Sequence, residues 1–147
     1  MLTMSEQQSL WRCDRVISSD AAACRQVLND VVEQLEARHW VQRDVFSIHL
    51  AIEEALSNAI QHGNHFDTAK HIRVSCCLYP HRVRIEIADE GGGFNPEALP
   101  DPTCDEQVHQ PTGRGVMLMK AFMSRVEFNN RGNGVTMEKE RGHDEDG

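Results

Sequence analysis

Residues 48–64, with the sequence IHLAIEEALSNAIQHGN, decide the fold more than any other stretch of the chain. Apolar residues recur here at helical spacing, which predicts an amphipathic helix with one buried face: Ile48, Ile52, Ala55, Leu56 and Ala59. We expect this helix to run from about Arg43 to His62, because Asp44 lies in its first turn and Gly63 is a common stop residue.

Three polar residues of this helix follow one another at every fourth position: Glu54, Asn58 and His62. Each is rotated by about 40° from the one before it, so the three lie along one border of the apolar stripe. In such a row, the carboxylate can hold a proton, the amide oxygen a metal–phosphate and the imidazole a phosphate oxygen. The alternative interpretation is a helix-edge Glu–Asn pair, which stabilises a helix by on the order of a few tenths of a kcal/mol.

The rest of the sequence predicts further helices and strands on both sides of this helix. A strand over 10–17 ends at Ser18, Ser19 or Asp20, any of which could cap a helix over 21–38. The later segments are two strands over 71–79 and 82–88, a short helix over 116–123, and two strands over 126–129 and 135–139. Adjacent strands with grouped helices predict an α+β two-layer sandwich, in which helices cover one face of a mixed, mostly antiparallel sheet.

A second polar cluster, Asp89-Glu90-Gly91-Gly92-Gly93, follows the strand over 82–88. Glycine lets a ligand approach the backbone closely, and a carboxylate beside such a turn can accept a hydrogen bond from an exocyclic amine. The alternative is a plain turn made of turn-forming residues. The segment over 95–112 is rich in Pro, Asp and Gln, and a loop of that length predicts a lid or a binding loop.

A third cluster, Thr112-Gly113-Arg114-Gly115, opens the short helix. Free backbone N–H groups and the positive end of the helix dipole make a helix start suitable for phosphate, and an arginine there adds a charged contact. The alternative is a flexible loop that meets a helix. No GxxxxGK[ST] motif occurs anywhere, which excludes a P-loop protein.

Composition narrows the class of protein. The chain has 147 residues, which suits one domain over 1–141 and an acidic, disordered tail over 142–147. Its net charge of −8 argues against direct nucleic-acid binding. The five cysteines lack the spacing of a disulfide framework or zinc site, and no apolar run fits a signal peptide or a membrane span. We therefore expect a cytoplasmic protein with reduced thiols and no membrane partner.

The order and spacing of the three clusters are more specific than each cluster alone. ExxxN on a helix, DxGxG after a strand and GxG opening a helix resemble the GHKL ATPase superfamily. EEALSNAIQHGN and GRGVMLMKAFMSRVEF are most similar to the small bacterial anti-sigma factor serine/threonine-protein kinases. The matching residues are Glu54 and Asn58, then Asp89, Gly91 and Gly93, then Gly113 and Gly115, and finally Thr136 as the closing threonine of the family.

This resemblance implies a Bergerat-type ATP-binding fold with ATP and Mg²⁺ as cofactors. Glu54 would be the general base that prepares the attacking hydroxyl. Asn58 would coordinate Mg²⁺ between the phosphates, and Asp89 would receive the adenine amine. Gly91 and Gly93 would let the backbone approach the base.

The same resemblance implies roles for the residues around the phosphates. Gly113, Arg114 and Gly115 would close on the phosphates, and Thr136 would support the adenine end. His62 and Asn64 follow the ExxxN motif where relatives often carry polar residues, and they would have a supporting role.

Two hypotheses of function follow from these residues. The first is an anti-sigma factor with protein-serine kinase activity, which phosphorylates a small anti-sigma-factor antagonist and sequesters a sigma factor by partner switching. The second is a non-catalytic nucleotide-binding regulatory module that acts by protein–protein binding. A third, less favoured hypothesis is a detached ATPase domain of a sensor histidine kinase. Relatives are commonly dimers, so a homodimer is also an expectation.

Overall fold

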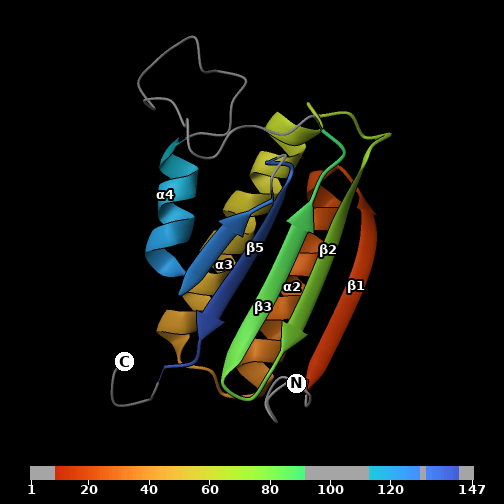
Figure 1. The fold of residues 1–147 in the computed structure, drawn as a ribbon. Helices are drawn as coiled ribbons and strands as arrows, with labels where there is room; N and C mark the ends of the chain where they lie inside the picture. Colours follow the sequence, from red (N-terminus) through yellow and green to blue (C-terminus); the bar gives the residue numbers. More distant parts are fainter. Residues whose placement is uncertain (1–8, 92–112, 130–131, 143–147) are drawn as a thin grey trace, which may run out of the picture.

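The fold is known from a computed structural model that describes residues 9–91, 113–129 and 132–142 (Figure 1). The elements run in the order that the sequence predicts. They are strand β1 (Trp11–Ser18), helices α2 (Ala21–Ala37) and α3 (Gln42–Asn58), a π-helical turn (Ala59–Gly63), strands β2 (His71–Leu78) and β3 (Arg82–Ala88), helix α4 (Gly113–Phe122), and strands β4 (Arg125–Phe128) and β5 (Gly134–Glu140).

The five strands form one sheet in the order β1-β2-β3-β5-β4, and the helices cover one of its faces (Figure 1). The predicted α+β two-layer architecture is confirmed. The expected mixture of strand directions is not found, because every pairing between described strands is antiparallel. β5 lies between β3 and β4, so these two strands, which run in the same direction, do not pair with each other.

The core lies between the sheet and the helices. Alternate residues of β3 are buried, namely Val83, Ile85 and Ile87, because successive side chains of a strand point to opposite faces. They pack with the apolar stripe of α3, where Ile48 and Ile52 are completely buried. The predicted stripe is thus the face that α3 turns toward the sheet.

Two carboxylates near helix starts accept hydrogen bonds from backbone N–H groups. Of the three predicted caps for α2, Asp20 is the one that acts, since its carboxylate accepts a hydrogen bond from Ala23 N at 2.8 Å. In the first turn of α3, the buried Asp44 accepts a hydrogen bond from Gly142 N at 2.7 Å. Gly142 was expected to begin a disordered tail, but this bond holds it against α3. Residues 143–147 lie outside the described residues.

The end of α3 differs from the predicted regular helix. The chain stays helical up to Gly63, but its last turn is widened to π geometry, and Asn64 N donates to Ala59 O at 2.8 Å. A π turn adds a residue to a helical turn, so residues after Asn58 leave the straight track predicted from every fourth position. The apolar spacing of a five-residue segment does not distinguish the two geometries.

Within the described ranges, none of the helices combines the length and the apolar character needed to cross a membrane.

The core predicts a specific loss of stability. We expect Ile52→Ala to lower the free energy of unfolding by about 2–5 kcal/mol, because it leaves a cavity between α3 and the sheet. Val16→Ala is the control, since the Val16 side chain on β1 is 63% exposed and its loss leaves no cavity. Urea unfolding would measure both, and equal losses in the two variants would contradict the assigned core.

Candidate functional site

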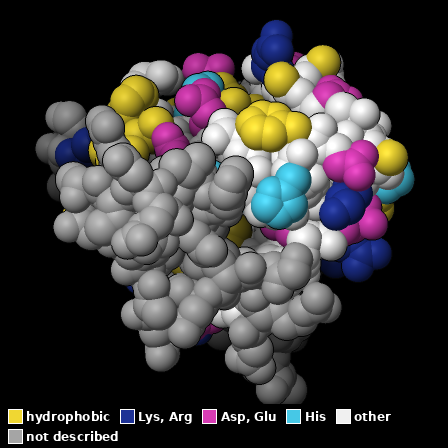
Figure 2. Space-filling view, turned by 90° about the horizontal axis from the view of Figure 1, so that it is seen from above, with side chains coloured by type: hydrophobic (Ala, Val, Ile, Leu, Met, Phe, Trp, Pro, Cys, Tyr) yellow, Lys and Arg dark blue, Asp and Glu magenta, His cyan; other side chains and the backbone are white. Residues whose placement is uncertain are grey.

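Three polar segments meet at one end of the molecule. The C-terminal end of α3, the C-terminal end of β3 and the N-terminal end of α4 all lie at the top of the fold (Figure 1). The described part of this end carries acidic, basic, histidine and apolar side chains (Figure 2). The topology therefore brings together the segments of the three predicted motifs, which are far apart in the sequence.

Asp89 is held at this end by hydrogen bonds of both its side chain and its main chain. It follows β3 directly and is half-buried. Its carboxylate Oδ1 accepts a hydrogen bond from Gly91 N at 2.7 Å, and its own N–H donates to Asn133 O at 2.9 Å. Within the described residues, no hydrogen bond reaches the second carboxylate oxygen, Oδ2. That oxygen can accept a hydrogen bond from a ligand.

Burial shifts the pKa of Asp89. Loss of water around the side chain raises the pKa of the Asp89 carboxyl above its ordinary value. The Gly91 N–H group and the nearby His65 and Lys70 lower this pKa, but by less, so the net shift is upward. The folded protein therefore carries a partly desolvated carboxylate, whose hydrogen bond to a donor is strengthened by the low local dielectric.

Two glycines let the helix end and the strand end touch. A Cβ atom placed on Gly63 would lie 2.2 Å from Asp89 Cγ, and one on Gly91 would lie 2.1 Å from Gly63 O. Both distances are far below any van der Waals contact, so neither position admits a side chain while this arrangement is kept. The sequence predicts Gly63 only as a helix stop, but in the structure it also forms the contact with Asp89.

Two asparagines brace the segment around Asp89. Asn64 is completely buried; its Nδ2 donates to His71 O at 3.0 Å and its Oδ1 accepts from Glu90 N at 2.9 Å. Asn133 Nδ2 donates to Asp89 O at 3.4 Å and to Gly91 O at 3.3 Å. The sequence does not single out Asn133, because asparagine is common in hairpin turns and this residue is marked only by its place just before β5.

Glu54 and Asn58 lie one turn apart on α3, as their spacing predicts, and both side chains are partly exposed. His62 is partly exposed and lies in the π-helical turn between Asn58 and Gly63. A carboxylate, an amide and an imidazole therefore precede the Asp89 contact along the same helix.

The third motif opens α4, which packs against α3 (Figure 1). Gly113 is the first residue of α4, and Gly115 is buried in its first turn. The Arg114 side chain, Gly93 and the expected lid over 95–112 lie outside what the structure describes.

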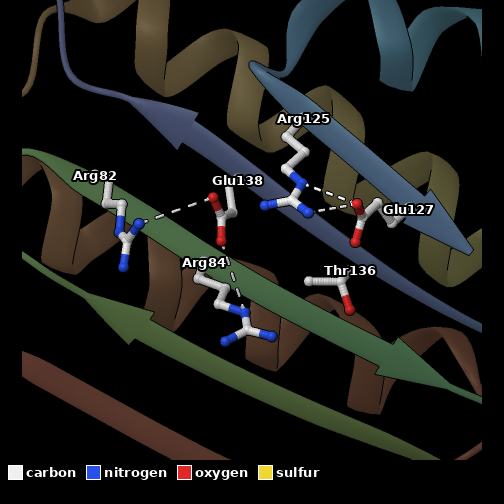
Figure 3. A pocket seen from close by; sticks show the side chains of 6 residues that line it. All are labelled: Arg82, Arg84, Arg125, Glu127, Thr136 and Glu138. Atoms are coloured by element: carbon white, nitrogen blue, oxygen red, sulfur yellow. Dashed lines mark hydrogen bonds and ion pairs between the residues drawn. The ribbon is translucent and has the colours of Figure 1, made fainter. Parts of the chain in front are cut away.

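Thr136 is not brought together with the other predicted residues. On β5, Val135 and Met137 are buried toward the helices, so Thr136 points to the opposite face of the sheet. It lines a pocket of about 250 Å³ there with charged neighbours (Figure 3): Arg82, Arg84, Arg125, Glu127 and Glu138. The residue of this hairpin that contacts Asp89 is Asn133.

The site offers oxygen ligands but no preformed metal cluster among the described residues. No group of three His, Cys, Asp or Glu side chains in these ranges is placed to hold a metal ion. Asn58 offers one amide oxygen, which suits Mg²⁺ when phosphates and water supply the other ligands. The half-buried Asp89 carboxylate suits a ligand that carries an amine, while the two glycines serve the close contact between the helix end and the strand end.

The raised pKa of Asp89 predicts how stability depends on pH. Stabilisation by the protonated carboxyl is complete below the unfolded-state pKa, near 3.8, and is lost as pH rises through the raised folded-state pKa. Asp89→Asn has no such loss and keeps an acceptor for Gly91 N. We expect its free energy of unfolding, relative to wild type, to rise between acid and neutral pH and then level off.

Urea unfolding at a series of pH values measures this difference. Asp67→Asn is the matched control, because the exposed Asp67 also accepts a backbone hydrogen bond two residues on, from Ala69 N at 2.9 Å. A difference for Asp89→Asn that falls toward neutral pH, or that matches the control at every pH, would contradict the burial effect.

Known proteins are similar to this chain in sequence and in fold. The family model of the histidine kinase-like ATPase domain matches residues 17–139. The serine-protein kinase RsbW of Bacillus pumilus is 31% identical over 109 residues, which cover 68% of this chain and 67% of that protein. The anti-sigma F factor of Oceanobacillus iheyensis is 26% identical over 113 residues, covering 76% of this chain and 75% of that protein.

Other matches are partial. The serine-protein kinase RsbW of Oceanobacillus iheyensis is 28% identical over 88 residues, so the chain spans only 56% of the length of that relative. The solved structure of the RsbU and RsbW domains of Rv1364c from Mycobacterium tuberculosis has a TM-score of 0.60 at 20% identity. It covers 89% of this chain and 31% of that chain, and it shows a shared fold. Since the family model matches most of the sequence and the helix, strand and glycine segments meet as the GHKL resemblance predicts, the chain belongs to the histidine kinase-like ATPase domain family.

Proposed function

We propose that this chain is an ATP-dependent protein-serine kinase that also acts as an anti-sigma factor. It would transfer the γ-phosphate of ATP to a serine of a small anti-sigma-factor antagonist and would sequester a sigma factor by exchange of partners. We further propose that it is a single domain over 1–141 that works in the cytoplasm as a homodimer. The names of the serine-protein kinase and anti-sigma relatives support this choice over other members of the family.

One observation carries the proposal: the contact between Gly63, at the end of α3, and the Asp89 carboxylate, at the end of β3. It joins the helix that bears Glu54 and Asn58 to the residue suited to bind an adenine amine. A base-binding group and a group for phosphate chemistry thereby occupy one end of the fold. Coincidental glycines would not require this close approach.

The residues of the site have separate tasks in the proposed reaction. Asp89 Oδ2 would accept a hydrogen bond from the exocyclic amine of adenine, and the glycine backbone would let the base approach. Glu54 would accept the proton of the attacking serine hydroxyl. Asn58 would offer an oxygen to Mg²⁺, which neutralises phosphate charge when bound. Phosphoryl transfer depends mostly on such positioning and charge neutralisation, so few protein groups are needed.

Nucleotide binding is the first test of this function. We expect Mg²⁺-ATP and Mg²⁺-ADP to raise the melting temperature by several degrees at a hundredfold excess over Kd, since such binding adds about 2.7 kcal/mol of stability. GTP should give a smaller shift, because guanine has a carbonyl where adenine has its amine. Asp89→Asn should lose the shift relative to its own ligand-free melting temperature. The absence of a shift with any nucleotide would exclude an ATP-dependent kinase.

The role of Glu54 is tested by phosphate transfer. We expect Glu54→Gln to lower the rate of transfer from γ-labelled ATP to a cognate antagonist by about 10²–10⁴-fold, while ATP binding is kept. Glu53→Gln is the matched control. The exposed Glu53 carboxylate lies 3.9 Å from His49 Nδ1, which is a weak surface ion pair, so this substitution should leave the rate unchanged. Equal rates in both variants would remove Glu54 as the base. Binding of ATP without transfer by the wild-type protein would favour the non-catalytic regulatory module.

A further inference from the structure

Asn64 is a completely buried polar residue whose groups are all used. Its side chain donates to His71 O at 3.0 Å and accepts from Glu90 N at 2.9 Å. Its backbone N–H donates to Ala59 O at 2.8 Å, and its backbone carbonyl accepts from Asp67 N at 2.9 Å. One residue thus links the end of α3, the start of β2 and the segment after β3.

The Asn64 amide lies where the pairing of β2 and β3 ends. The last pair of this register is Arg73 opposite Ala88, and continuing it would place His71 opposite Glu90. Asn64 bonds the carbonyl of the first and the N–H of the second, so its amide acts like a peptide group inserted between the strands. Only a short side chain with both a donor and an acceptor does this, which explains an asparagine here.

Asn64 and Asn133 together fix the main chain at Asp89 and at the residue after it. Asn64 holds the following residue, Glu90, through its N–H, while Asn133 O accepts from Asp89 N at 2.9 Å. The Asp89 side chain is held in turn by Gly91 N and by contact with Gly63, the neighbour of Asn64. The direction of Asp89 Oδ2 therefore depends on where Asn64 keeps the strand end.

We propose that Asn64 is a positioning residue for recognition of the nucleotide base, which sets the direction of the Asp89 carboxylate and so the preference for adenine over guanine. This rests on the proposed function, in which Asp89 receives the adenine amine. A carboxylate held in place accepts from the amine of adenine and opposes the carbonyl oxygen of guanine. When the carboxylate is free to turn, both effects weaken together, because a buried polar site discriminates only while its groups are fixed.

A double-mutant cycle with Asp89 tests this inference. The Kd values of Mg²⁺-ATP and Mg²⁺-GTP are measured by calorimetry, well below the melting temperature, for wild type, Asn64→Ala, Asp89→Asn and the double variant. We expect Asn64→Ala to weaken ATP by at least about tenfold and to lower the ATP preference over GTP. In the Asp89→Asn background, Asn64→Ala should cause no further loss of ATP affinity, since Asn64 acts through the carboxylate.

Two more variants serve as an alternative substitution and as a control. Asn64→Asp keeps the acceptor for Glu90 N but has no donor for His71 O while ionised, so it should lose base preference as well. If Asn64→Ala does not fold, Asn64→Asp takes its place in the double-mutant cycle. Asn29→Asp, the same change at an exposed position of α2, is the matched control and should leave both Kd values unchanged.

The outcomes separate this inference from the proposed function. A lower melting temperature for the Asn64 variants with unchanged Kd values and base preference would show a purely structural role and overturn the inference. Losses that add to those of Asp89→Asn would overturn it as well. If wild type binds no ATP, or Asp89→Asn binds it normally, the proposed function fails first, in arms that contain no Asn64 variant, and the inference fails with it.

Discussion

The site depends on one steric constraint: the main chain at Gly63 lies against the Asp89 carboxylate and the Gly91 backbone. Without a Cβ on either glycine, a helix end and a strand end approach closely enough for backbone to touch side chain. The π-helical turn brings Gly63 to this point, and the buried Asn64 holds it there. Burial of Asp89 at this contact disfavours its ionised form, but the desolvated carboxylate binds a hydrogen-bond donor more strongly than a solvated one does.

The sheet gives the site its rigidity because its two faces are divided in character. One face is covered by helices and carries the apolar alternation of β3 and β5, while the other carries paired charges such as Arg84 with Glu86 at 2.8 Å. This division fixes the register, because a slip by one residue would exchange the buried and charged faces. Because the register is fixed, Asp89, which follows β3, has a fixed position along α3.

Much of the fold could be predicted from periodicity. The alternation of Val83, Ile85 and Ile87 gave β3 with its correct bounds, and the apolar stripe with Gly63 gave the helix that ends beside Asp89. Thr136 shows where the family resemblance and periodicity disagree. It stands between the apolar Val135 and Met137, so strand alternation alone points it away from the helices, whereas the family resemblance implied a role at the adenine end. Alternation was the better guide to its direction.

The rest could not be predicted because it depends on hydrogen bonds between distant segments. The burial of Asn64 follows from the meeting of two strand ends, and Asn133 gains its contacts only once the hairpin folds beside Asp89. Neither has an apolar pattern that would indicate its place. Gly63 was identified, but the sequence contains no sign of the carboxylate that lies against it.

The bond between Asp44 and Gly142 has a mechanical consequence. It fastens the first turn of α3 to the chain that leaves β5, while Asn64 fastens the other end of α3 to β2 and to the segment after β3. Hydrogen bonds at both ends of the helix oppose sliding of α3 along the sheet. We therefore expect a change of shape on ligand binding to involve other parts of the chain more than the spacing between Glu54 and Asp89.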